Sequence, residues 1–102
     1  MCGILAQLAF DGIIDARDFA GRLAAQGHRG PDGQSTWIAP DQSVALGHNL
    51  LSLTGTTNVR QPLASEDGQT VASVNGEFYG YQHIRSELKG KGHHHCWEDK
   101  PW

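Results

Sequence analysis

Residues 1–10 read Met-Cys-Gly-Ile-Leu-Ala-Gln-Leu-Ala-Phe, and the Asp-Gly pair at 11–12 ends this apolar run with a turn signal. Polar and apolar side chains do not alternate cleanly in the run, which predicts a strand over 4–10 that is buried on both faces. The run is too short to span a membrane, and no basic segment precedes it, so we expect neither a membrane span nor a secretory signal. We therefore expect a cytoplasmic protein in which Cys2 and Cys96 do not form a disulfide.

Composition limits the fold around this strand. With 102 residues, 38% of them hydrophobic, the chain can bury one modest core, and its 13 glycines indicate short elements joined by tight turns. The net charge is −3 and the basic residues are scattered, so no nucleic-acid partner is expected. Without internal repeats or a linker, we expect one partial domain over 1–93, followed by a divergent tail over 94–102.

The remaining pattern predicts short strands and two helices. Phe19 and Leu23 lie four residues apart in an amphipathic stretch, with Asp15 as the expected N-cap and Gly27 as the stop. A second helix is expected to turn Ile84 and Leu88 inward. The expected ranges are helices over 16–26 and 82–89, strands over 35–39, 43–47 and 69–74, and a loop over 28–33. Strands that alternate with helices indicate an α/β or α+β architecture.

Cys2 is the first residue that suggests chemistry. An initiator methionine is normally removed when a small residue follows, which would leave a thiol and a free α-amine on the same residue. Such an amine has a pKa of about 7.7–8.0, so it can act as general base for its own side chain. For an isolated Met-Cys start, a small buried residue that begins a strand is the favoured interpretation.

The Asn75-Gly76 pair follows a predicted strand and also allows two interpretations. The side-chain amide of Asn75 and the backbone N–H of Gly76 could stabilise an oxyanion. Most Asn-Gly pairs are instead simple hairpin turns.

Five short motifs occur in order along the chain: MCGI at 1–4, HRGPDG at 28–33, LGH at 46–48, QPL at 61–63 and NGEFY at 75–79. Together they resemble the class II glutamine amidotransferases, whose nucleophile is an N-terminal cysteine, and the asparagine synthetase branch in particular. The resemblance covers residues 1 to about 93. It implies an α+β fold, the four-layer αββα sandwich of the N-terminal-nucleophile hydrolases, of which this chain would supply only the front part.

The resemblance also implies an activity, the hydrolysis of glutamine to glutamate and ammonia. Cys2 would attack the side-chain amide of glutamine, and Asn75 and Gly76 would stabilise the oxyanion. Further residues implied at the glutamine pocket are Leu50, Leu51, Ser52, Leu53, Thr54 and Glu77. No cofactor is expected in this chain, because ATP and Mg would serve a synthetase domain, absent here, that accepts the ammonia.

Two departures from the family pattern bear on substrate binding. Leu50 occupies the position at which the family has an arginine that binds the glutamine α-carboxylate, a contact that leucine cannot make. Arg60 is our candidate for the missing charge. The tail lacks the family's Ser-Asp segment, and Asp99 is the residue that could replace its aspartate. Arg29 and Asp32 are expected to be structural, with Arg29 binding loop carbonyls and Asp32 capping a turn.

The tail leads to further expectations. It suggests a truncated product, and a non-catalytic remnant with unpaired sheet edges, acting as an interaction module or homodimer, is the alternative to the enzyme. The run His93-His94-His95-Cys96 raises a third idea, a metal-binding peptide. Four adjacent side chains point in different directions, so we expect no metal site but a disordered polar tail.

Overall fold

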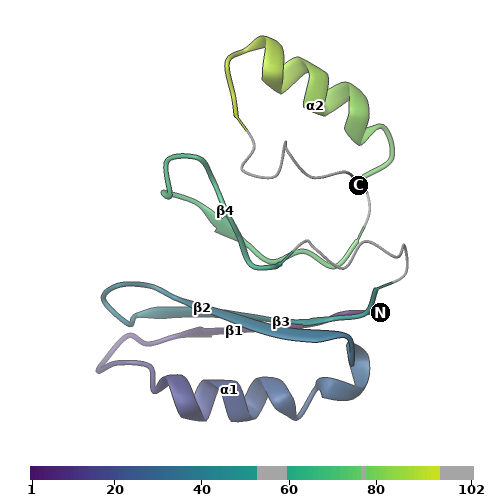
Figure 1. Ribbon diagram of the computed structural model, residues 1–102. Coiled ribbons are helices and arrows are strands. Elements are labelled where there is room, and N and C mark those ends of the chain that lie inside the picture. Colours follow the sequence, from purple (N-terminus) through teal and green to yellow (C-terminus); the bar gives the residue numbers. More distant parts are fainter. Residues whose placement is uncertain (53–59, 77, 95–102) are drawn as a thin grey trace. The chain divides into compact units, whose positions relative to one another are not determined.

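The computed structural model describes residues 1–52, 60–76 and 78–94 (Figure 1). The chain divides into two compact units. Unit 1 comprises Met1–Leu63 and Ala72–Asn75, and unit 2 comprises Ala64–Val71 and Gly76–Trp102. Each is described by itself.

A three-stranded antiparallel sheet forms the centre of unit 1. Its strands are β1 (Gly3–Leu8), β2 (Gly33–Ile38) and β3 (Val44–Leu50), and β3 lies between the other two. Gly3 pairs with Asn49, and Gly33 pairs with Leu50. The start of β1, the start of β2 and the end of β3 therefore meet at one end of the sheet. Three of the four strands expected from the sequence are confirmed here, with boundaries shifted by up to three residues.

Helix α1 (Ala16–Ala24) covers one face of this sheet (Figure 1). Asp15 caps it as predicted, because its carboxylate accepts the N–H of Asp18 at 2.8 Å. Phe19 and Leu23 are fully buried. The helix ends at Ala24, and the predicted stop Gly27 instead begins the 3₁₀ turn η1 (Gly27–Arg29).

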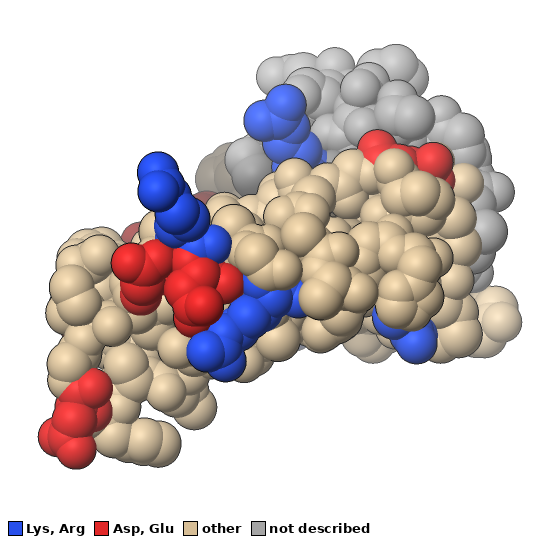
Figure 2. Space-filling model, turned by 90° about the horizontal axis from the view of Figure 1, so that it is seen from below, with Lys and Arg blue, Asp and Glu red and all other residues tan. Residues whose placement is uncertain are grey.

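The solvent side of α1 carries both signs of charge. Arg22 and Asp18 form an exposed i, i+4 ion pair at 3.0 Å. Figure 2 shows acidic and basic side chains interspersed over the described part of this face, not gathered into a patch of one sign.

The prediction that the first strand is buried on both faces is wrong. Burial alternates along β1, and Leu8 is 64% exposed. The reason is that β1 is an edge strand of the sheet, and α1 covers only one of its faces. Phe10, which follows the strand, is 92% exposed.

A two-stranded sheet and a second helix complete the described chain. Strands β4 (Leu63–Ala64) and β5 (Val71–Ala72) pair with each other, so the strand predicted over 69–74 is much shorter than expected. Helix α2 (Tyr81–Gly90) is confirmed, but none of its residues is buried. The expectation that Ile84 points inward is therefore wrong, since this side chain is 46% exposed.

These elements confirm the α+β class. The finer αββα prediction is not reached, because the described residues of unit 1 form one sheet with a helix on a single face. Neither α1 nor α2, the helices of the described part of the chain, is long and apolar enough to cross a membrane.

Candidate functional site

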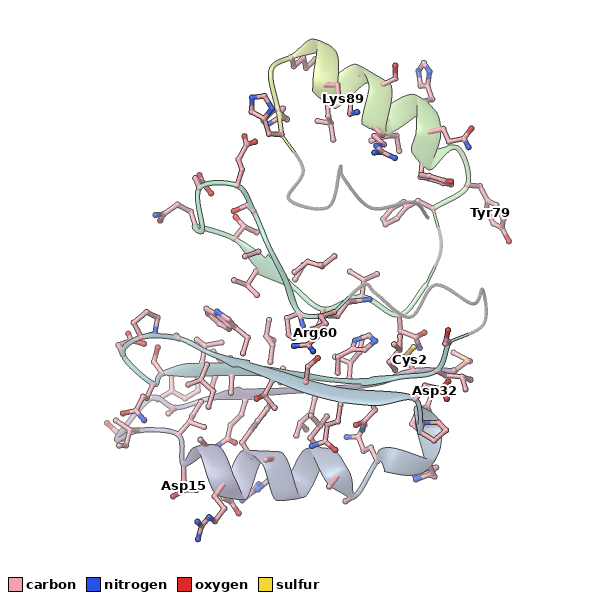
Figure 3. The ribbon with its side chains drawn as sticks, viewed as in Figure 1. Cys2, Asp15, Asp32, Arg60, Tyr79 and Lys89 are labelled. Carbon is pink, nitrogen blue, oxygen red and sulfur yellow. The ribbon has the colours of Figure 1, made fainter. Side chains whose placement is uncertain are left out.

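Cys2 lies just before β1, on the side of the sheet away from α1 (Figure 3). The thiol is half-buried. Its Sγ accepts the backbone N–H of Leu51 at 3.3 Å and lies 3.8 Å from the carbonyl oxygen of the same residue. The sulfur is therefore held against the chain that leaves β3, which is where the paired ends of β1 and β3 bring it.

Two side chains from distant parts of the sequence donate to the backbone carbonyl of Cys2. Asn75 reaches it through Nδ2 at 3.3 Å, and Arg29 through Nε at 3.3 Å. The structure thus brings Asn75, 73 positions away, to the candidate nucleophile. Arg29 binds a backbone carbonyl, as the sequence predicted.

The loop after η1 fixes the segment that touches the thiol. Asp32 donates its N–H to the carbonyl of Leu50 at 2.9 Å and accepts the N–H of Ser52 at 2.7 Å. The predicted turn-capping role of Asp32 is wrong in detail, because its carboxylate bonds to residue 52 across the sheet end. Gly30 packs so closely that a Cβ there would lie 2.2 Å from the carbonyl oxygen of Asn49.

A cavity of about 340 Å³ opens in unit 1 beside this segment. Leu50 and Arg60 both line it, so the residue that replaces the expected arginine and the candidate substitute border the same cavity. Arg60 lies on the same side of the sheet as Cys2 (Figure 3), although Cys2 does not line the cavity. The lining residues are Asp32, Gly33, Gln34, Ser35, His48, Leu50, Arg60 and Gln61.

His48, in the middle of β3, is a polar residue with only 1% of its surface exposed. Its Nδ1 lies 2.9 Å from Ser73 Oγ, whereas Nε2 has no partner among the described residues. Burial lowers the pKa of His48 below its usual value, which keeps the imidazole neutral near neutral pH. No role was predicted from the sequence for His48 or Gln61. Their only signal was membership of the LGH and QPL motifs.

Apart from Leu50 and Arg60, which line the cavity, the predicted site residues fall into three groups. Cys2, Leu51 and Asn75 come together, with Ser52 held beside them by Asp32. Gly76 belongs to unit 2, so its position at the thiol stays a prediction. The remaining predicted residues, Leu53, Thr54, Glu77 and Asp99, lie outside the described residues.

The start of the C-terminal tail is held within unit 2. Glu66 accepts the N–H of His94 at 2.6 Å and lies 3.0 Å from Nδ1 of His93, and these bonds lower the pKa of Glu66. The prediction of a disordered tail is therefore wrong for His93 and His94. No group of three or more His, Cys, Asp or Glu in the described ranges is arranged to hold a metal ion. His95 and Cys96 lie outside them.

Comparison with known proteins agrees with the resemblance of the motifs. Residues 1–98 match a family model described as glutamine amidotransferase domain. The chain is 41% identical over 92 residues to a probable asparagine synthetase [glutamine-hydrolyzing] of Schizosaccharomyces pombe, a match that covers 88% of the chain and 16% of that protein. It is 32% identical over 120 residues to a probable asparagine synthetase [glutamine-hydrolyzing] of Dictyostelium discoideum, covering 98% and 20%.

A third relative carries a different name. The chain is 33% identical over 100 residues to the amidase chry2 of Gibberella zeae, a match that covers 86% of the chain and 15% of that protein. The chain thus spans a fifth or less of the length of these three relatives. No solved structure matches it significantly.

Proposed function

Because the chain belongs to the glutamine amidotransferase domain family, we propose that it is the glutaminase part of an asparagine synthetase-like amidotransferase. The observation that carries the proposal is the placement of Asn75 Nδ2 at the backbone of Cys2, 3.3 Å from its carbonyl oxygen. A hydrogen-bond donor for an oxyanion thereby lies beside a candidate nucleophile. The alternative of a non-catalytic interaction module is not favoured, since it accounts for neither the family match nor this juxtaposition.

Met1, which is 72% exposed, is removed by proteolytic processing before the chain can act. The freed α-amine of Cys2 takes the thiol proton, and the thiolate attacks the side-chain amide carbon of glutamine. The tetrahedral intermediate collapses when its C–N bond breaks, and ammonia leaves with the proton that the α-amine returns. Water then hydrolyses the glutamyl thioester, which releases glutamate and restores the thiol.

Asn75 can serve the oxyanion without releasing Cys2. Its side-chain nitrogen carries two hydrogens. One holds the carbonyl of Cys2, and the other can donate to the oxyanion. The backbone N–H of Gly76, the next residue along the chain, is the proposed second donor.

The α-carboxylate of glutamine is proposed to bind in the cavity that Leu50 and Arg60 line. Arg60 would make there the charge-assisted contact that Leu50 cannot. Glu77 and Asp99 remain the proposed ligands of the substrate's ammonium group, and residues 51–54 the proposed lining of the pocket.

The ammonia is proposed to pass to a synthetase site of the kind named in the relatives, where ATP and Mg would be used. The αββα sandwich and a cytoplasmic location belong to the same proposal. The sandwich is supported by the family and by the sheet of unit 1, which α1 covers on one face only.

The proposal is tested with a glutamine-analogue electrophile and intact mass spectrometry. We expect the purified chain to lack Met1 and to gain one label on Cys2. The variant Cys96→Ser should label normally and Cys2→Ser should not, which separates the two thiols. Asn75→Ala should slow labelling roughly 100-fold, the effect of losing one oxyanion donor. A chain that retains Met1, or labels equally fast with the matching glutamate analogue, would end the proposal.

A further inference from the structure

The segment that carries Asn75 has little regular structure to hold it. β5 ends at Ala72, three residues earlier, and none of the residues 73–75 belongs to a helix or strand. An oxyanion donor must nevertheless be held within a fraction of an ångström of its productive position. The contacts of residues 73–75 within unit 1 must therefore determine the position of Asn75.

Gln61 supplies the main contact. Its side-chain Oε1 accepts the N–H of Val74 at 2.6 Å, and its Nε2 donates to the carbonyl oxygen of Val74 at 2.9 Å. One side-chain amide thus satisfies both backbone groups of a single residue, as a neighbouring strand would. The residue held in this way directly precedes Asn75.

The sheet anchors both sides of this contact. The hydroxyl of Ser35 donates to the backbone carbonyl of Gln61, and His48 Nδ1 lies 2.9 Å from Ser73 Oγ. Ser35 and His48 are themselves directly paired in the β2–β3 register. A continuous set of contacts therefore runs from the middle of the sheet to the residue before Asn75.

The strengths of these bonds favour a positioning role over a role in folding. Gln61 is only half-buried, and the net contribution of one such hydrogen bond to stability is small, because on folding it replaces hydrogen bonds to water. Its loss should leave the buried core of α1 and the sheet intact. A displacement of Asn75 by about 1 Å, in contrast, can lower a reaction rate roughly 100-fold.

We propose that Gln61 is a positioning residue for the oxyanion donor Asn75, with His48 as its partner through Ser73. Gln61 also lines the cavity proposed for the glutamine α-carboxylate, but the role inferred here is exercised through the backbone of Val74. The inference rests on the proposed glutaminase function, and it assigns a role to a residue of the QPL motif that the sequence did not explain.

The test compares two reagents on Cys2, the glutamine-analogue electrophile and the small thiol reagent iodoacetamide. The analogue carries an electrophilic carbonyl where glutamine has its side-chain amide, so that thiolate attack generates an oxyanion, whereas iodoacetamide loses iodide from its CH₂ group and generates none. For Gln61→Ala we expect the analogue rate to fall roughly 10- to 100-fold while alkylation by iodoacetamide is unchanged. Gln69→Ala, which removes an exposed glutamine of unit 2, is the matched control and should behave as the unaltered chain. Gln61→Glu keeps the acceptor for the Val74 N–H but loses the donor to the Val74 carbonyl. Its analogue rate should therefore lie between those of the unaltered chain and Gln61→Ala.

A double variant shows whether Gln61 acts through Asn75. Adding Gln61→Ala to Asn75→Ala should cause no further loss of analogue rate, since residues that act as a unit are not additive. Fully additive losses, an unchanged Gln61→Ala rate, or an equal decrease with both reagents would each overturn the inference.

Amide resonances separate failure of this inference from failure of the proposed function. If the unaltered chain shows no preference for the glutamine analogue, the glutaminase proposal fails, but the contacts can still be measured. Gln61→Ala should then speed exchange of the Val74 amide proton and shift the side-chain amide signals of Asn75, whereas Gln69→Ala should do neither. Unmoved Asn75 signals would overturn the positioning role by itself.

Discussion

Leu50 ends β3 on the wall of a cavity that it shares with Arg60, so an apolar side chain and a guanidinium face the same space. If Arg60 binds the glutamine carboxylate, Arg60→Ala removes a charge-assisted hydrogen bond worth about 1.5–3 kcal/mol. We expect the dissociation constant for glutamine, measured by protection of Cys2 from labelling, to rise roughly 10- to 150-fold.

Two variants control this experiment. Arg22→Ala removes an exposed arginine of α1 and should leave glutamine affinity unchanged. Adding Leu50→Arg to Arg60→Ala should restore part of the affinity, because it returns a guanidinium to the other side of the cavity. Unchanged binding in Arg60→Ala would rule out its role as the carboxylate ligand.

Single residues were predictable from the sequence where a motif carried a chemical role. Cys2 and Asn75 were selected as nucleophile and oxyanion donor, and they lie together. Gln61 and His48 were not, because they bond to the backbone of Val74 and to Ser73, and neither contact leaves a periodic pattern in the sequence. The hydrogen bonds between the side chain of Gln61 and the backbone of Val74 depend on the tertiary fold, which brings together two segments 13 residues apart.

Gly30 illustrates a residue whose identity is set by space rather than by backbone angle. A Cβ would lie 2.2 Å from the carbonyl oxygen of Asn49, and backbone atoms cannot move aside as a side chain can. We expect Gly30→Ala to lower the free energy of unfolding by about 1–3 kcal/mol, the cost of overpacking. It should also slow labelling of Cys2, because β3 and the segment that holds the thiol must shift.

Chemical denaturation measures this effect, with Gly21→Ala as the comparison. Gly21 lies within α1, and a Cβ there would meet no described atom within 4 Å apart from its chain neighbours and the helix's own backbone, so alanine should stabilise the helix by about 0.5–1 kcal/mol. A Gly30→Ala variant as stable as the unaltered chain would show that the loop at Gly30 relaxes without cost.

At the scale of elements, the sequence predicts what local chemistry determines. α1 begins where Asp15 can cap it, and the spacing of Phe19 and Leu23 identifies its buried face. The strand predicted over 69–74 begins later than expected for an equally local reason. The carboxylate of Asp67 accepts the N–H of Gln69 at 3.0 Å, which favours a turn and delays pairing until Val71.

The position of an element within a sheet is harder to predict. β1 was expected to be buried on both faces because its sequence is apolar, but it lies at an edge. β3 occupies the centre and carries the buried polar residues His48 and Asn49. α1 satisfies one half of the Asn49 amide, since its Nδ2 donates to the carbonyl of Leu23 at 2.8 Å, whereas its Oδ1 has no partner among the described residues. Hydropathy alone assigns such residues to a surface.

At the scale of the whole molecule, the two helices differ in what they bury. α1 contributes Phe19 and Leu23 to the core, whereas α2 has no buried residue. Isolated helices shorter than about 12–15 residues are marginal in water, and α2 has 10 residues. The ion pair of Glu87 with Lys91 at 2.7 Å is exposed and adds little.

The rates of amide hydrogen exchange should therefore differ between α1 and α2. Opening of α1 requires loss of the packing between helix and sheet, so its amides should exchange with the free energy of unfolding of unit 1. The amides of α2 need only local fraying, and we expect their protection to be at least about 100-fold lower than that of Phe19 and Leu23. Equal protection of both helices would contradict this expectation, because it would require a buried surface on α2. The exposed Ile84, mutated to serine, would then be the first residue to test for a contact that stabilises the helix.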